Sequence, residues 1–150
     1  MRPDSPAPTK SDVPLRTVAE IFRRVKKGLF GFVSTATIAD ATPAAVVAHT
    51  RQRGTAPEIV DMYLSGLKNY SWPNGGGAEV IFGGGAEQFI PGSGSLGGQD
   101  YYKKFADAGY QVTYDKTGLQ KLDSKKKALG IFCKSNMVGL GLLPRSIVSS

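Results

Sequence analysis

The 150-residue sequence has only one cysteine and one histidine. With a single thiol, that of Cys133, an internal disulfide is excluded. Its place in the apolar run ALGIFC predicts a buried, unreactive side chain. Zinc sites in proteins take several ligands, drawn mostly from His and Cys. The chain therefore does not assemble a zinc site from its own His49 and Cys133.

The sequence also lacks long apolar runs and clusters of basic residues interleaved with aromatic ones. No stretch is apolar for long enough to span a membrane, and the N-terminus lacks the apolar core of a signal peptide, so we expect neither a membrane span nor an export signal. The formal net charge of +7 raises nucleic acid as a partner. However, the clusters Arg23–Lys27 and Lys125–Lys127 carry no interleaved aromatic residues, which favours solvated surfaces over a nucleic-acid site.

The remaining composition is that of a globular domain rich in turns. Hydrophobic residues make up 41% of the chain and charged residues 21%, with nineteen glycines and nine prolines. We interpret residues 1–12 as a flexible, Pro-rich arm, residues 13–137 as one α/β domain, and residues 138–150 as a tail of atypical character.

One stretch, residues 31–53, has the pattern of a strand, a loop and a short helix. Its bulky and β-branched residues from Phe32 to Ile38 predict a strand that is covered on both faces. A helix is expected to begin at Pro43, preceded by the capping residues Asp40 and Thr42. Asp40, Thr42 and Arg53 would then lie near the carboxyl end of a strand, where open α/β sheets usually bind ligands.

An amphipathic helix is predicted over residues 13–27. Val18, Phe22 and Val25 recur at helical spacing, so we expect this side to pack on the sheet and the charged side to face solvent. Asp12 is the expected N-cap, and Gly28 is expected to end the helix in a left-handed conformation. The alternative for a basic amphipathic helix is a membrane surface.

The other expected elements alternate between strands and helices. Strands are predicted over residues 78–82, 110–114 and 128–133, helices over 58–67, 100–108 and 117–122, and loops over 69–77 and 91–98. Trp72 in the first loop is expected to pack on the edge of the domain. This order predicts an α/β fold, a largely parallel sheet with helices on both faces.

Three consecutive glycines, Gly83 to Gly85, follow the predicted strand 78–82. Glycines at such a turn can bring backbone N–H groups close to a phosphate. The run GGGAEQF has neither the GxGxxG spacing nor the Lys and hydroxyl pair of a nucleotide-binding loop. We favour a turn where two backbones cross closely and keep a small nucleotide-binding domain as the alternative.

The segment STATIADATPAAVVAHTRQR closely resembles the part of alkaline phosphatases that carries a magnesium-site Thr and the arginine that binds the substrate phosphate. The segments AEVIFGGGAEQF and DAGYQVTYDKTGL are also similar to this family, and the resemblance runs from about Pro14 to Met137. It implies an incomplete α/β domain of the alkaline phosphatase and sulfatase type, from a metal-dependent hydrolase of phosphate monoesters.

The resemblance also implies roles for individual residues. Thr42 would be a magnesium ligand, Asp40 would bond metal-bound water, and Arg53 would be the catalytic and substrate-binding phosphate clamp. The implied parent uses a serine nucleophile, two zinc ions and one magnesium ion, is a homodimer, and is periplasmic or secreted. The nucleophile and the zinc ligands are absent from this chain, so we expect it to be inactive alone.

The sequence allows two further interpretations. A non-catalytic structural fragment is the alternative to an enzyme segment. A catalytic triad of Ser34, His49 and Asp40 is rejected, because nothing in the spacing brings the three together, and His49 is expected to pack or bond locally.

Overall fold

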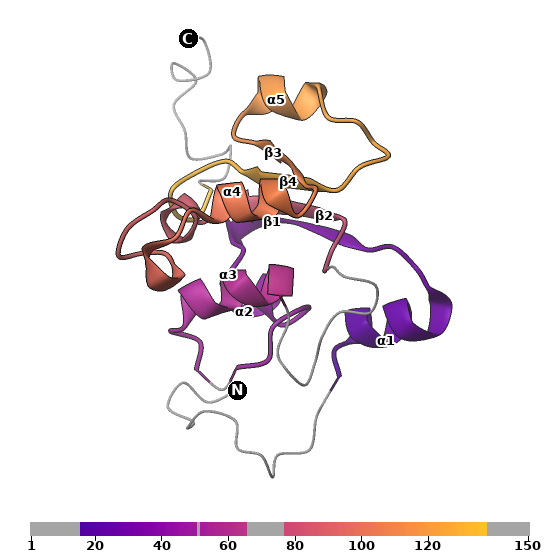
Figure 1. Cartoon of the computed structure of the whole chain (residues 1–150). Coiled ribbons are helices and arrows are strands. Elements are labelled where there is room, and N and C mark those ends of the chain that lie inside the picture. The colour runs from indigo at the N-terminus through magenta and orange to yellow at the C-terminus, as the bar shows by residue number, and fades with distance from the viewer. Residues whose placement is uncertain (1–15, 51, 66–76, 138–150) are drawn as a thin grey trace.

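The computed structural model describes residues 16–50, 52–65 and 77–137, and Figure 1 shows their arrangement. The elements in chain order are α1 (Val18–Lys26), β1 (Gly31–Thr37), α2 (Ala41–Ala44), α3 (Ala56–Ser65), β2 (Val80–Gly84), α4 (Tyr101–Asp107), β3 (Gln111–Thr113), α5 (Lys116–Gln120) and β4 (Ala128–Ile131). Two short 3-10 helices, η1 (Ala86–Gln88) and η2 (Leu96–Gly98), follow β2. The expected arm 1–12, Trp72 and the tail 138–150 lie outside the described residues.

The four strands form one sheet in the order β1-β2-β4-β3, and every neighbouring pair is parallel. Phe32, Ile81 and Leu129 are in register across three of them. Figure 1 shows α2 and α3 below the sheet and α5 above it. The predicted α/β fold with a parallel sheet and helices is therefore confirmed.

The core lies between this sheet and α3 and α4. Ile59, Val60 and Tyr63 of α3 are buried beside Ile81 and Leu129 of the sheet. Three aromatic residues that follow β2, Phe89, Tyr101 and Phe105, extend the same cluster. The Tyr63 hydroxyl donates a hydrogen bond of 2.7 Å to the Ile38 carbonyl, which ties α3 to the end of β1.

The prediction that β1 is covered on both faces is wrong. Phe32 packs against the ring of Tyr63, with 5.2 Å between ring centroids, but Val33 on the other face is 73% exposed. Side chains alternate between the two faces of a strand, and β1 is the outermost strand of the sheet. A run of β-branched residues indicates a strand but does not show how many of its faces are covered.

The expected orientation of α1 is also wrong. Its N-cap is Thr17, which forms a capping box with Glu20, and Lys27 rather than Gly28 takes the left-handed conformation, at φ 54°. The residues of α1 that are buried are Ala19, Glu20 and Arg23. Val18, Ile21, Phe22 and Val25 are exposed instead. The helix therefore faces the rest of the described chain with its charged side.

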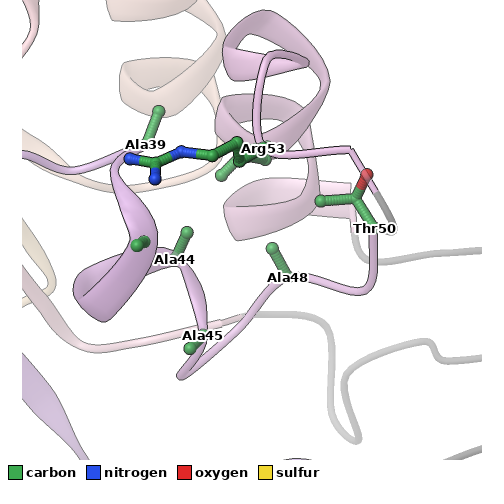
Figure 2. A pocket seen from close by; sticks show the side chains of 8 residues that line it. Ala39, Ala44, Ala45, Ala48, Thr50 and Arg53 are labelled. Atoms are coloured by element: carbon green, nitrogen blue, oxygen red, sulfur yellow. The ribbon is translucent and has the colours of Figure 1, made fainter. Parts of the chain in front are cut away.

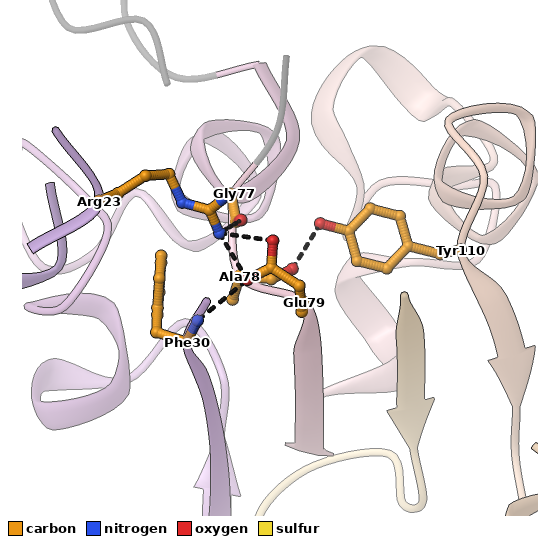
Figure 3. Close-up of polar contacts among 6 residues, drawn as sticks. All are labelled: Arg23, Phe30, Gly77, Ala78, Glu79 and Tyr110. Carbon is orange, nitrogen blue, oxygen red and sulfur yellow. Dashed lines mark hydrogen bonds and ion pairs between the residues drawn. The ribbon is translucent and has the colours of Figure 1, made fainter. Parts of the chain in front are cut away.

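Buried ionic contacts fix this orientation (Figure 3). The Arg23 guanidinium donates to Glu79 Oε1 at 2.6 Å and to the Gly77 carbonyl at 2.8 Å. Glu79 also accepts a bond of 3.0 Å from the Phe30 backbone N–H. Just before β2, the Tyr110 hydroxyl donates a hydrogen bond of 2.7 Å to the Ala78 carbonyl. The pair is largely shielded from solvent, so removing one partner would leave the other charge without its counter-ion and destabilise the fold.

Cys133 lies beyond the end of β4 and is half-buried, whereas the sequence predicted a buried strand residue. Its thiol donates to the Ser135 carbonyl at 2.8 Å. The segment around it crosses the glycine turn closely, since a Cβ atom at Gly84 would lie 2.0 Å from the Ser135 oxygen. This contact supports the interpretation of the three glycines as a place where backbones cross.

The buried tyrosines predict a loss of stability at alkaline pH. Burial raises the pKa of Tyr110 and Tyr102 to about 12, from an ordinary value of 10.0, and raises the pKa of Tyr63 further. An unfolded tyrosine loses its proton near pH 10, while the folded one keeps it, so the unfolded state binds fewer protons between these values. We expect the free energy of unfolding to fall as the pH rises from about 10 to about 12.

Urea unfolding at a series of pH values measures the free energy of unfolding, and phenolate absorbance follows the loss of the tyrosine protons. The Tyr110→Phe variant removes one of the titrating groups, so its stability should fall less steeply over the same pH range. Val33→Thr is the control, because Val33 is exposed and the substitution changes no titrating group. A stability that stays constant from pH 9 to 12 would contradict the prediction.

Candidate functional site

The candidate site lies where β1 ends and α2 begins. Ile38 donates its N–H to the Gly84 carbonyl at 3.1 Å, and Asp40 donates to the Thr37 carbonyl at 3.0 Å, so the chain turns sharply after the strand. Asp40 occupies the N-cap position of α2, but its side chain makes no capping bond. The helix spans only Ala41–Ala44, so it begins before the predicted start at Pro43, and Thr42, which was expected to precede and cap it, lies within it.

The side chain of Asp40 contacts Arg53 instead. Asp40 Oδ1 accepts a bond of 3.0 Å from Arg53 Nη2, across thirteen residues of sequence. The two side chains are 42% and 64% exposed, so this ion pair contributes little to stability. A guanidinium has five N–H donors, and this contact uses one nitrogen. The pair therefore holds a cation in solvent at the carboxyl edge of the sheet, as the sequence predicted.

A cavity of about 340 Å³ lies beside Arg53, and Figure 2 shows the arginine running along one side of it. Small side chains leave this space between α2 and α3. The lining residues are Ala39, Ala41, Ala44, Ala45, Ala48, Thr50, Arg53 and Ile59. Ligand pockets are typically apolar clefts with a few polar groups, and here the polar group with a full charge is Arg53.

Thr42 is exposed on α2, two residues beyond Asp40. The structure thus places Asp40 and Thr42 in one turn and pairs Asp40 with Arg53. No group of three or more His, Cys, Asp or Glu that could hold a metal ion occurs within residues 16–50, 52–65 and 77–137. Magnesium requires about six oxygen ligands, so the described residues do not fit a metal site by themselves.

The glycine turn after β2 offers less than the nucleotide-binding alternative requires. The N–H groups of Gly85 and Ala86 both donate to the Cys133 carbonyl at 3.0 Å. The N–H of Gln88 donates to the Gly85 carbonyl at 3.1 Å. Backbone donors that are already bonded do not bind a phosphate without breaking these contacts, so this alternative loses its main support.

His49 lies within 2.8 Å of Glu20 on α1, from Nε2 to Oε1. His49 and Glu20 are 29 residues apart in the sequence, so the expectation that His49 bonds locally is wrong. The side chain of Glu20 also closes the capping box of α1. The pairing with Glu20 agrees with the rejection of a triad that contains His49.

The family model described as alkaline phosphatase matches residues 10–139, which is most of the chain. The chain belongs to the alkaline phosphatase family. A curated relative, the streptomycin-6-phosphate phosphatase of Streptomyces griseus, is 32% identical over 136 residues, covering 81% of this chain and 29% of the relative. The predicted resemblance is thereby confirmed.

Solved alkaline phosphatases share the fold. The enzyme of Thermus thermophilus superposes with a TM-score of 0.63 at 30% identity, over 78% of this chain and 22% of that one. The enzyme of the Antarctic bacterium TAB5 gives a TM-score of 0.64 at 21% identity, over 83% and 33%. This chain therefore spans less than a third of the length of the curated relative and about a fifth to a third of these structures.

Among the described residues, no helix has the length and apolar character needed to cross a membrane. The roles of Asp40, Thr42 and Arg53 are not decided by these comparisons, which identify the family and the fold.

Proposed function

We propose that this chain is the phosphate-binding segment of a metal-dependent phosphomonoesterase. The observation that supports this most is the exposed guanidinium of Arg53, held by Asp40 at the carboxyl edge of a parallel sheet and beside an open cavity. The substrates would be phosphate monoesters, as in the curated relative whose name states that it acts on streptomycin 6-phosphate.

Arg53 suits this role because of its shape and charge. The planar guanidinium offers parallel N–H donors that match two oxygens of a phosphoryl group. Asp40 accepts a bond of 3.0 Å from one nitrogen of this guanidinium, Nη2, which is one of its several donors. Negative charge that develops on the phosphoryl oxygens in the transition state would be stabilised by the same donors.

Asp40 and Thr42 would contribute to a magnesium site only with carboxylates that this chain does not place beside them. The serine nucleophile and the ligands for two zinc ions would likewise come from other parts of the parent protein. We therefore derive no metal-dependent step from this chain and propose that it is inactive by itself. The parent would be a periplasmic or secreted homodimer that does not bind nucleic acid.

A non-catalytic structural fragment remains the second candidate. It would share the fold and the family and leave Arg53 without a ligand. The exposure of Arg53 favours binding over structure, because the arginine that holds the fold together, Arg23, is buried and ion-paired with Glu79, whereas Arg53 is 64% exposed.

Hydrolysis of p-nitrophenyl phosphate with added zinc and magnesium tests the proposal. One sample is the purified chain. The other is an exchange protein, in which residues 10–139 of this chain replace the matching segment of the Streptomyces griseus phosphatase. We expect no turnover above background by the chain and metal-dependent turnover by the exchange protein. An exchange protein that is folded but inactive would contradict the proposal, and an active isolated chain would contradict the assignment of the missing groups.

A further inference from the structure

A second cavity, of about 530 Å³, lies at the carboxyl edge of the sheet and shares no lining residue with the cavity beside Arg53. We call it the η1 cavity, because η1 and the loop that follows it form most of its wall. Its polar lining side chains are Glu87, Gln88, Ser93 and Lys134. None of these has a part in the proposed phosphate site, so the cavity needs an explanation of its own.

The loop that forms one wall of the η1 cavity is held by specific contacts. Ser95 is buried, and its backbone N–H and its hydroxyl both donate to the Gly92 carbonyl, at 3.3 Å and 3.2 Å. Gly94 packs against η1, since a Cβ atom there would lie 2.3 Å from the Glu87 carbonyl oxygen. These contacts fix the course of the loop, so the groups that it presents to the cavity have defined positions.

Two opposite charges line the η1 cavity without pairing with each other. Glu87 lies on η1, after β2, and its N–H donates to the carbonyl of Lys134, after β4, at 3.5 Å. Among the described residues, the Lys134 ammonium has no ion-pair partner. Glu87 Oε1 accepts a bond of 3.0 Å from Gln88 Nε2, and in the same part of the chain the carboxylate has no cation. A ligand that donates to Glu87 and accepts from Lys134 would satisfy both groups.

The rest of the chain offers few groups that would neutralise these charges. Residues 138–150, which begin four positions after Lys134, contain no Asp or Glu and one basic residue, Arg145. Residues 1–15, 51 and 66–76 contain two acidic side chains, Asp4 and Asp12. The tail that adjoins Lys134 in the sequence therefore brings it no acidic side chain. Arg145 is a rival partner for Glu87, which an experiment can exclude.

The η1 cavity is a neighbour of the candidate phosphate site. Pro57, in the first turn of α3, lines the η1 cavity, and Ile59, two residues further on, lines the first cavity. The segment that follows Lys134 crosses to β1, where the Asn136 side chain accepts a bond of 2.8 Å from the Thr37 N–H. Figure 1 shows the segments after β2 and β4 at the same edge of the sheet. The organic group of an ester whose phosphate lies in the first cavity therefore has the η1 cavity as its neighbouring pocket.

We propose that the η1 cavity binds the hydroxyl-rich organic group of a phosphate ester, that of a sugar or a cyclitol. A hydroxyl both donates and accepts, so one such ring satisfies Glu87 and Lys134 together. The C–H face of the ring would lie on Ile90 and Pro91, which belong to the apolar part of the lining. The two charges sum to zero, which favours a neutral group over a second anion.

This inference rests on the proposed function only for the phosphate, because the sugar site is argued from Glu87 and Lys134. An amino acid is the other neutral candidate, with its ammonium on Glu87 and its carboxylate on Lys134. However, a cavity of about 530 Å³ has the size of pockets that hold drug-sized ligands, and a single small amino acid would fill only part of it.

Titration of the full 150-residue chain with trehalose, followed by backbone amide chemical shifts, tests the site without any phosphate. We expect shifts at Ser93, Gly94 and Lys134 that saturate with a dissociation constant of about 1–10 mM, a weak affinity because Ser93 and Lys134 are exposed. Lys134→Ala and Glu87→Gln should each weaken binding about tenfold and keep the melting temperature within about 2 °C. Lys126→Ala, which changes an exposed lysine outside the cavity, is the matched control.

Three results would overturn the proposal. The absence of saturating shifts, or equal binding by Lys134→Ala and the native chain, would mean that the cavity binds no sugar. Saturation by L-serine but not by trehalose would assign the cavity to a zwitterion. Tighter binding of trehalose by Arg145→Ala would mean that Arg145 already pairs with Glu87, so that the chain itself occupies the cavity.

Kinetics of the exchange protein separate this inference from the proposed function. The measured quantity is the ratio of kcat/KM for trehalose 6-phosphate to kcat/KM for p-nitrophenyl phosphate, which has no sugar. Lys134→Ala should lower this ratio about tenfold, because the site then loses a donor to the substrate hydroxyls. An unchanged ratio would refute the role of the cavity in substrate choice. An exchange protein without turnover, while the chain still binds trehalose, would refute the phosphatase role and keep the sugar site.

Discussion

Replacing Arg53 by alanine in the exchange protein should lower kcat/KM for p-nitrophenyl phosphate by about 10³-fold, with an unchanged melting temperature. Removing one preorganised donor of a developing oxyanion typically costs about 10²–10³ in rate, and the guanidinium offers two. Stability should be unaffected because the Asp40 contact is solvent-exposed. Steady-state kinetics and thermal unfolding of the same sample measure both quantities.

Two variants sharpen this result. Arg53→Lys keeps the positive charge but loses the planar pair of donors, so we expect a loss between those of the native protein and the alanine variant. Gln52→Ala changes an exposed neighbour in the same turn and serves as the control. If Arg53→Ala retained more than a third of the native kcat/KM, Arg53 would not bind the phosphate, and the structural-fragment interpretation would be preferred.

The parallel sheet and its order of elements could be predicted because their signals are local. A short apolar run between charged residues, as at residues 128–133 between Lys127 and Lys134, indicates a buried strand. A capping aspartate indicates a helix start, as Asp100 does for α4. That Asp40 and Arg53 lie near one another could be predicted, because both follow the end of one strand. The hydrogen bond between them could not, since helix-capping rules place the Asp40 side chain on α2.

The orientation of α1 could not be predicted for a different physical reason. Helical periodicity shows that a helix has an apolar side but does not show whether the partner of that side is present. The decisive contact joins Arg23 to Glu79 across 56 residues of sequence, and no local pattern indicates it. Arg23 was assigned to the solvent side because a charged residue is seldom buried unless it is paired. Its pairing becomes visible only in the fold.

A side chain at Gly84 should destabilise the isolated chain more than a change at any other glycine of the run. A Cβ atom there would lie 2.0 Å from the Ser135 oxygen and 2.9 Å from Cys133 Sγ. Backbone oxygen cannot move aside as a flexible side chain can, so the whole crossing segment must shift. We expect Gly84→Val to lower the melting temperature by roughly 10 °C or more, as measured by circular dichroism.

The size of this effect follows from what the crossing segment holds in place. The Cys133 carbonyl accepts hydrogen bonds from the N–H groups of Gly85 and Ala86. Further along, the Asn136 side chain accepts a bond of 2.8 Å from the Thr37 N–H, and the Met137 N–H donates to the Thr35 carbonyl at 2.7 Å. Each lost hydrogen bond costs about 1 kcal/mol, and more where a buried group is left unpaired. Two of these bonds end on β1, just before Asp40, so the displacement would reach the candidate site.

Gly54→Ala is the matched control for this prediction. No atom lies within 4 Å of a Cβ placed at Gly54, so its melting temperature should stay within about 2 °C of the native value. Equal effects of the two substitutions would show that the backbones at Gly84 do not cross as closely as described. A Gly84→Val chain that kept its stability but lost nucleotide binding would restore the phosphate-cradle interpretation, because the glycine would then serve a ligand rather than the crossing.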